Sequence, residues 1–105
     1  MKTRPGEIWL ADLGIAGKTR PVLIVSRADP NPPRTLCVYV PLTSQNRGSQ
    51  YEIQMRAFPF LREESWANVQ AIGSIPEARL VRKLGDAGKE TLATVHEAIR
   101  FALGM

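Results

Sequence analysis

The stretch TRPVLIV at residues 19–25 decides the fold, because a second apolar stretch, LCVYVPL, follows at residues 36–42. Between them lies DPNPPR at residues 29–34, which is dense in turn-forming residues and predicts a hairpin loop. If the two strands pair about the centre of this loop, Arg20 lies opposite Thr43 at one rim of the sheet. A permanent cation beside a hydroxyl predicts a small site for an anion.

Further segments are predicted to form short strands. They lie at residues 6–12, 50–56, 65–72 and, as a short strand or turn, 80–81. Tyr51, Ile53 and Met55 alternate with polar residues, so the strand that contains them should bury one face. Residues 13–18 and 85–88 each contain two glycines, which predict a mobile connection and a chain break respectively.

The last predicted element is an amphipathic helix. Residues 89–103 carry apolar side chains at spacings of three and four, and Gly104 would end the helix. This helix would cover one face or an open edge of the sheet. Hairpin-linked strands followed by one helix indicate a single domain over residues 1–105. The domain should be mainly β, built as a small barrel or a curled sheet.

Composition sets weak limits on function. The 105 residues include 14 Lys and Arg against 10 Asp and Glu, a net charge of +4 that suits a polyanionic partner without identifying one. Cys37 is the single cysteine and falls in an apolar strand, so we expect it to be buried in a protein of a reducing compartment. No signal peptide or membrane-spanning apolar run is recognisable, and we therefore expect a cytoplasmic protein.

The residue types exclude several kinds of active site. One histidine and one cysteine, far apart in apolar elements, cannot supply the usual ligands of a transition metal, so neither a metal nor another cofactor is expected. The glycines between residues 14 and 17 lack the P-loop pattern of nucleotide-binding proteins. His96 lies beside the apolar stripe of the predicted helix, and we expect it to pack there rather than to transfer protons.

Arg20 has two interpretations. As an ordinary surface arginine it would pair with Glu7 or Asp12. As a functional residue, its forked guanidinium would hold a phosphate in a way that lysine cannot reproduce. The hydroxyls and amide of residues 43–45 favour the second interpretation, because a pentacovalent phosphorane carries more negative charge than the diester. A fixed cation and hydroxyl would then stabilise the transition state more than the substrate.

Other side chains could bind a strand of nucleic acid. Contacts to its backbone could come from Lys18, Arg20, Arg47 and Arg56. Stacking on bases could come from Trp9, Tyr39, Tyr51 and Trp66. Most of these aromatic residues are nevertheless expected in the core of a small β domain. A second basic cluster is interpreted as a solvated face and contains Arg79, Arg82 and Lys83.

Several motifs together resemble one family. They are RPGEIW at residues 4–9, GKTRPVLI at 17–24, VPLTS at 40–44, SWANVQ at 65–70 and AIRFALG at 98–104. In this order they resemble the MazF/PemK family of toxin–antitoxin ribonucleases. The resemblance implies a small SH3-like β-barrel of the kind shared with CcdB-like toxins, and a homodimer. It also implies a metal-independent, sequence-specific endoribonuclease, an mRNA interferase, that cleaves single-stranded RNA by attack of its own 2′-hydroxyl.

The resemblance also assigns residues. The family's arginine before Pro-Val falls on Arg20, which would stabilise the phosphorane, and its strand-end threonine falls on Thr43, which would hydrogen-bond the same group. The substrate-binding residues are expected to be Lys18, Ser44, Gln45 and Arg47. Some PemK-type members have a later catalytic arginine closely followed by an acid. Arg79 is followed by two apolar residues, so that second site is not transferred.

The expected partners follow from the same resemblance. A cognate antitoxin would lay an acidic, disordered C-terminal tail into the RNA groove, and the pair could bind operator DNA. Two other functions remain open from the residues. The chain could be a non-catalytic barrel that binds nucleic acid or a peptide, or it could be a relative of the toxins of this fold that poison DNA gyrase.

Overall fold

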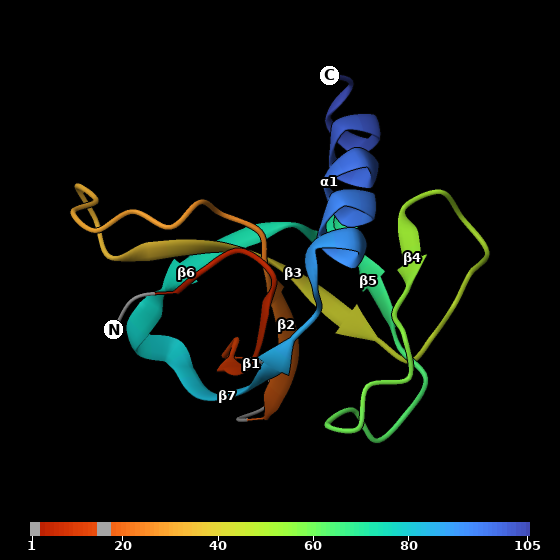
Figure 1. Ribbon diagram of the computed structural model, residues 1–105, viewed down its shortest axis with the longest axis horizontal. Helices are drawn as coiled ribbons and strands as arrows, with labels where there is room; N and C mark the ends of the chain where they lie inside the picture. Colours follow the sequence, from red (N-terminus) through yellow and green to blue (C-terminus); the bar gives the residue numbers. More distant parts are fainter. Residues whose placement is uncertain (1–2, 15–17) are drawn as a thin grey trace.

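The computed structural model describes residues 3–14 and 18–105 of the chain (Figure 1). In these residues the chain forms seven strands followed by one helix. The elements are β1 (Glu7–Asp12), β2 (Thr19–Ile24), β3 (Leu36–Thr43), β4 (Glu52–Gln54), β5 (Trp66–Asn68), β6 (Gly73–Pro76), β7 (Leu80–Asp86) and α1 (Lys89–Leu103). The predicted class, mainly β with a C-terminal helix, is confirmed.

The strands form one antiparallel sheet in the order β4-β5-β3-β2-β1-β7, with β6 paired to β3. The hairpin register is as predicted: Val22 lies opposite Pro41, and two further pairs follow in step. Continued toward the rim, this register brings Arg20 level with Thr43, which itself pairs with Trp66 of β5. The predicted hairpin is therefore correct, and it holds the two site residues at the same end of β2 and β3.

The sheet is curled but does not close by hydrogen bonds. Among the described residues, β4 and β7 are the two ends of the paired order. A 3-10 turn, η2 (Glu77–Arg79), carries the chain from β6 to β7 without a ladder between them. The expectation of a curled sheet therefore describes the molecule better than that of a closed barrel.

Both faces of the central strands are buried. One cluster of buried residues lies between the sheet and α1, and includes Ile8, Leu23, Val40, Val69 and Val95. A second cluster on the opposite face includes Val22, Ile24, Cys37, Ile75 and Leu80. Alternate residues of β2 and β3 thus enter different clusters, which explains why these strands are continuous apolar runs. Helix α1 lies against the sheet (Figure 1), and its apolar side chains pack in the first cluster.

Two predicted strands are shorter than expected. The strand predicted over residues 65–72 is wrong beyond Asn68, because the next residues form a 3-10 turn, η1 (Val69–Ala71). The Asn68 side chain accepts a hydrogen bond from Gln70 N at 3.1 Å. This local bond takes the place of hydrogen bonds to a neighbouring strand. The strand predicted over residues 50–56 is limited to β4, although its apolar residues do pack on the first cluster as expected.

The C-terminal elements are mostly as predicted. Helix α1 has the expected bounds, and Gly104 ends it in the left-handed conformation with φ 72°. The break predicted at residues 85–88 is too early, since Gly85 and Asp86 still belong to β7. No helix in the described part of the chain is both long and apolar enough to cross a membrane. Part of the connection predicted to be mobile, residues 15–17, lies outside the described residues.

Cys37 and His96 have the structural roles that the sequence predicts. Cys37 is 1% exposed, and burial, with a smaller contribution from the charge of Glu77, raises the pKa of its thiol to about 11. His96 is half-buried on α1, with Nε2 3.1 Å from the carbonyl oxygen of Val25. Since a carbonyl only accepts hydrogen bonds, this ring nitrogen donates and ties the helix to the end of β2.

Candidate active site

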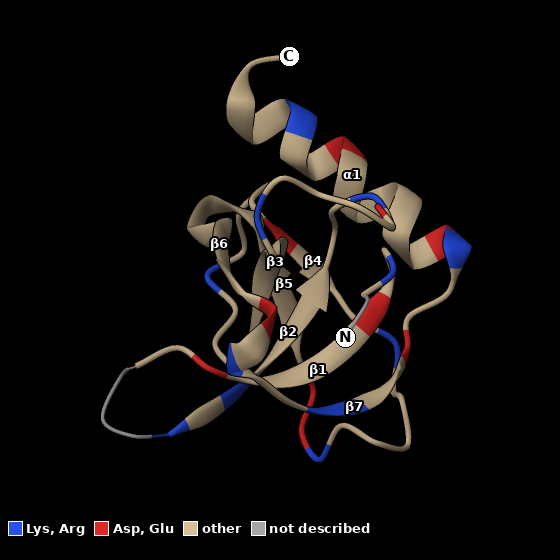
Figure 2. Cartoon of the chain, turned by 90° about the vertical axis from the view of Figure 1, so that its left-hand side faces the viewer, with Lys and Arg blue, Asp and Glu red and all other residues tan. Residues whose placement is uncertain are grey.

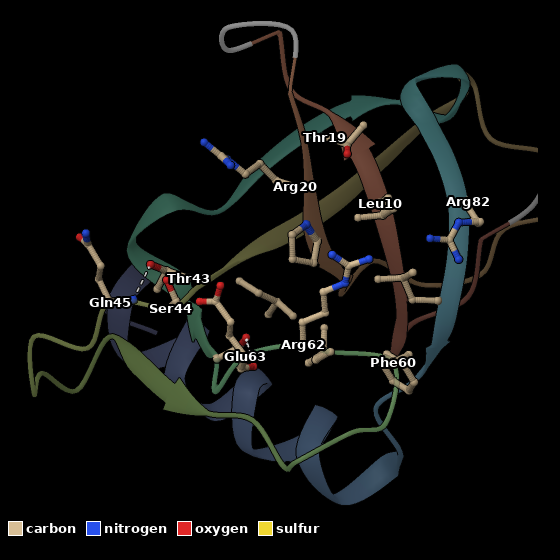
Figure 3. A pocket seen from close by; sticks show the side chains of 15 residues that line it. Leu10, Thr19, Arg20, Thr43, Ser44, Gln45, Phe60, Arg62, Glu63 and Arg82 are labelled. Atoms are coloured by element: carbon tan, nitrogen blue, oxygen red, sulfur yellow. Dashed lines mark hydrogen bonds between the residues drawn. The ribbon is translucent and has the colours of Figure 1, made fainter.

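A groove of about 660 Å³ opens beside the start of β2 and the end of β3 (Figure 3). Its floor is apolar and contains Leu10, Pro21, Leu42, Phe60, Leu61 and Leu84. Polar and charged side chains surround the floor: Thr19, Arg20, Thr43, Ser44, Gln45, Arg62, Glu63, Ser65 and Arg82. Four of the six residues predicted for the site therefore line a single groove, and two further arginines join them.

Three arginines reach this groove from different elements. Leu10 pairs with Pro21 on one side and with Arg82 on the other, and cross-strand partners share a face of the sheet. Arg82 therefore stands over the same floor as these two residues. Arg62 extends over the floor from the irregular segment 57–65, whereas Arg20 points outward at the rim, on the side of Thr43 (Figure 3).

Thr43 is held by the turn that follows β3. Its Oγ1 accepts a hydrogen bond from the backbone N of Gln45 at 3.1 Å. A hydroxyl that accepts one bond can still donate its proton, so Thr43 is positioned to donate to an anion in the groove. Ser44 and Gln45 are exposed beside it, which puts a second hydroxyl and an amide at the same rim.

The cations of the groove are not neutralised by nearby carboxylates. The ion pairs formed among the described residues involve Lys83 and Arg100, and none includes an arginine of the groove. The suggested partners of Arg20 are engaged elsewhere: Glu7 binds Lys83 at 3.2 Å, and Asp12 accepts a hydrogen bond from Gly14 N at 2.9 Å. The groove thus presents three guanidinium groups against the single carboxylate of Glu63, among its described lining residues, which favours an anionic ligand.

A second pocket of about 360 Å³ adjoins the groove and shares Thr43 and Gln45 with it. Arg47, Ser49, Tyr51, Glu52, Asn68 and Gln70 complete its lining. Backbone hydrogen bonds from Arg47 and then Ser49 lower the pKa of the Glu52 carboxyl and hold the turn before β4. Lys18 is exposed just before β2 and lines neither of these two pockets, although the next residue, Thr19, lines the groove.

Comparison with known proteins identifies the family of this chain. Residues 4–103 match the family model described as PemK-like, MazF-like toxin of type II toxin-antitoxin system. The chain belongs to the PemK/MazF toxin family. The family assignment made from the sequence motifs is therefore confirmed.

Solved structures of such toxins have the same fold over nearly the whole chain. An endoribonuclease in complex with its cognate antitoxin, from a mycobacterial species, has a TM-score of 0.85 and 26% identity, over 98% of this chain and 96% of that one. The Mycobacterium tuberculosis toxin MazF-mt6 has a TM-score of 0.82 and 29% identity, over 94% and 97%. MazF from Deinococcus radiodurans has a TM-score of 0.81 and 26% identity, over 100% and 99%.

In this PemK/MazF family member, the sequence patterns do not reveal the three other charged residues of the groove, namely Arg62, Glu63 and Arg82. The sequence predicts one solvated face for Arg79, Arg82 and Lys83, but the three side chains have different surroundings in the structure. Arg79 Nη1 donates to Asp12 O at 3.4 Å, while Lys83 binds carboxylates on the other face of β7. Alternation along β7, continued as far as Asp86, would have placed residues 82 and 84 together on the groove side. Segment 57–65 offers no such pattern.

No group of three or more potential metal-ligating side chains occurs in the part of the chain that the structure describes. The chemistry that the groove offers consists of permanent cations, hydroxyl donors and, among its described lining residues, one carboxylate. Such groups can bind a phosphodiester and stabilise negative charge that develops on it.

Proposed function

We propose that this chain is the toxin of a type II toxin–antitoxin system and acts as a metal-independent endoribonuclease on single-stranded RNA. The observation that carries the proposal is the placement of Arg20 and Thr43 at one groove, opposite two further arginines without carboxylate partners. Family membership supports it, and so do relatives of similar fold described as endoribonucleases.

The reaction needs only the substrate, the protein's own side chains and water. The 2′-oxygen of one nucleotide forms a bond to the adjacent phosphorus, and the bond from phosphorus to the 5′-oxygen of the next nucleotide breaks. The products are a 2′,3′-cyclic phosphate and a 5′-hydroxyl. Negative charge on the phosphoryl oxygens grows in the transition state, where Arg20 and the Thr43 hydroxyl would hold it more strongly than in the substrate.

The second pocket gives this RNA a path. Because Thr43 and Gln45 line both pockets, a strand whose scissile phosphate lies at Thr43 would put a neighbouring nucleotide against Arg47. The amides of Asn68 and Gln70 offer donors and acceptors for a base edge. Ser44, which follows β3, and Lys18, which precedes β2, would contact the RNA backbone. Cleavage of this kind would depend on sequence and would require unpaired bases.

The proposed partners are an antitoxin and a second copy of the chain. Solved relatives include a toxin in complex with its cognate antitoxin and a MazE–MazF complex from Deinococcus radiodurans. An acidic, disordered antitoxin tail would complement the cationic groove and exclude RNA from it. We include in the proposal a cytoplasmic location, a homodimer and joint binding of operator DNA with the antitoxin.

The test is incubation of the purified chain with single-stranded RNA in excess EDTA, followed by analysis of the new ends. We expect cleavage with 2′,3′-cyclic phosphate and 5′-hydroxyl ends. Binding of RNA without cleavage would instead make the chain a non-catalytic module. Intact RNA together with trapped gyrase–DNA complexes would make it a gyrase poison. Either result overturns the proposal.

A further inference from the structure

Glu63 is the single carboxylate among the described residues that line the groove. It belongs to the irregular segment between β4 and β5, and its side chain is exposed. Figure 3 shows this side chain extending into the groove toward Thr43 and Ser44. An acid among the cations of this groove would repel a phosphate, so its presence there calls for a chemical role.

The Glu63 carboxylate is not occupied by any hydrogen bond or ion pair found among the described residues. Only its backbone oxygen is bonded, because it accepts from Ser65 Oγ at 3.0 Å, and this bond fixes the chain at the groove. Two other glutamates near the groove do have side-chain partners. Glu52 accepts from Ser49 Oγ at 2.8 Å, and Glu64 accepts from Gln54 Nε2 at 3.2 Å. Glu63 therefore keeps both oxygens available to a ligand.

The proposed reaction requires a group that accepts the proton of the attacking 2′-hydroxyl. Arginine keeps its protons at physiological pH and has no acceptor atom, so the groove arginines cannot serve directly. The Thr43 oxygen already accepts from Gln45 N. His96 is bonded to Val25 O and is not part of the groove lining. Hydroxyl and amide oxygens are far weaker bases than a carboxylate, so Glu63 is the best proton acceptor among the described side chains of the groove.

We propose that Glu63 is the general base of this reaction; the inference rests on the proposed function. Glu63 takes the proton from the 2′-hydroxyl as the bond between the 2′-oxygen and phosphorus forms. The bond to the 5′-oxygen breaks, that oxygen takes a proton from solvent water, and Glu63 returns its proton to solvent. The other charged groups that line the groove are Arg20, Arg62 and Arg82, which bind the phosphate beside Glu63.

The test compares Glu63→Gln with Glu64→Gln, a matched control whose carboxylate has a partner outside the groove. Single-turnover cleavage of single-stranded RNA in EDTA gives the rate, and fluorescence anisotropy gives RNA affinity. We expect Glu63→Gln to lower the rate by about 10²–10³-fold, with RNA affinity equal to or higher than in the wild type. Glu64→Gln should stay within about twofold in both measurements, as is usual for a surface change away from the reacting atoms.

Acid dependence provides a second readout. The wild-type rate should fall with acid, because a protonated carboxyl cannot accept the 2′-proton, and Glu63→Gln should lose that dependence. A Glu63→Gln variant that cleaves at the wild-type rate or faster, or keeps the acid dependence, overturns the inference and leaves the proposed function standing. Absence of cleavage by the wild type overturns the proposed function and this inference with it.

Discussion

Arg82 and Lys83 are neighbours on β7, yet they belong to two different regions of the molecule. Lys83 Nζ lies 3.2 Å from Glu7 Oε2 and 3.4 Å from Asp86 Oδ2, on the face of β7 away from the groove. Arg82 stands over the groove floor and belongs to none of the ion pairs of the described residues. Figure 2 shows the basic residues of β7 within a chain whose charges are spread over many elements. Charge alone therefore does not reveal which cation is available to a ligand.

The two regions differ in how completely their charges are satisfied. The Glu7 side chain is 9% exposed, and this burial opposes its ionisation. Hydrogen bonds from Trp9 Nε1 at 3.0 Å and Arg4 N at 3.1 Å, together with Lys83, outweigh that cost and lower the pKa of Glu7. The hydrogen bond to Glu7 in turn raises the pKa of Lys83. The ion-paired region around Glu7 and Lys83 thus stabilises the fold, while the arginines of the groove remain available to a ligand.

The largest effect should come from removing the cation at the groove rim. Arg20→Ala should lower the single-turnover cleavage rate by about 10²–10³-fold, the usual loss when one preorganised donor to a developing anion is removed. Because Arg20 is exposed, the Tm should be close to that of the wild type. Arg27→Ala, an exposed arginine beyond the other end of β2, is the control and should retain full activity. Equal losses in the two variants would mean that only general positive charge matters.

A smaller effect should separate the two neighbours on β7. Arg82→Ala should weaken RNA binding by about tenfold and reduce the slope of log affinity against log salt by about one, since one phosphate contact is lost. Lys83→Ala should leave RNA affinity near that of the wild type but lower the Tm, because Glu7 loses its cation. Titration of labelled RNA at several salt concentrations and thermal unfolding provide the two readouts. If Lys83→Ala weakened RNA binding as much as Arg82→Ala, the distinction between the regions would be wrong.

The smallest effect concerns the Glu7 region alone. A carboxyl whose pKa is lowered by folding stabilises the protein at pH values above its ordinary pKa of 4.5. This stabilisation is lost as the pH falls through the lowered pKa. Glu7→Gln should therefore cost about 1 kcal/mol of unfolding free energy near neutral pH and much less in strong acid. Denaturant unfolding of both proteins at the two pH values measures this, with RNA cleavage at neutral pH expected to be unchanged. A deficit that grows in acid would have the wrong sign.

Local patterns in the sequence predict the hairpin, the helix and the two rim residues, because each depends on neighbouring residues and turn chemistry. The length of β7 could not be predicted in this way. Gly85 looks like a break, but pairing with Ile8 keeps it in the strand, and a Cβ there would overlap the ring of Phe60. The missed groove residues on segment 57–65 have no periodicity to place them, since tertiary packing of that segment brings them to the groove.

The most direct test of the central claim removes one oxygen atom from the substrate. Wild-type protein is given two RNAs of identical sequence, one of them carrying a single 2′-deoxy substitution at the nucleotide whose 3′-phosphate is cleaved. If the 2′-hydroxyl is the nucleophile at the groove of Arg20 and Thr43, the unmodified RNA is cut and the substituted one stays intact at that position. Cleavage of both RNAs at the same phosphate would contradict the account, because attack would then come from another nucleophile.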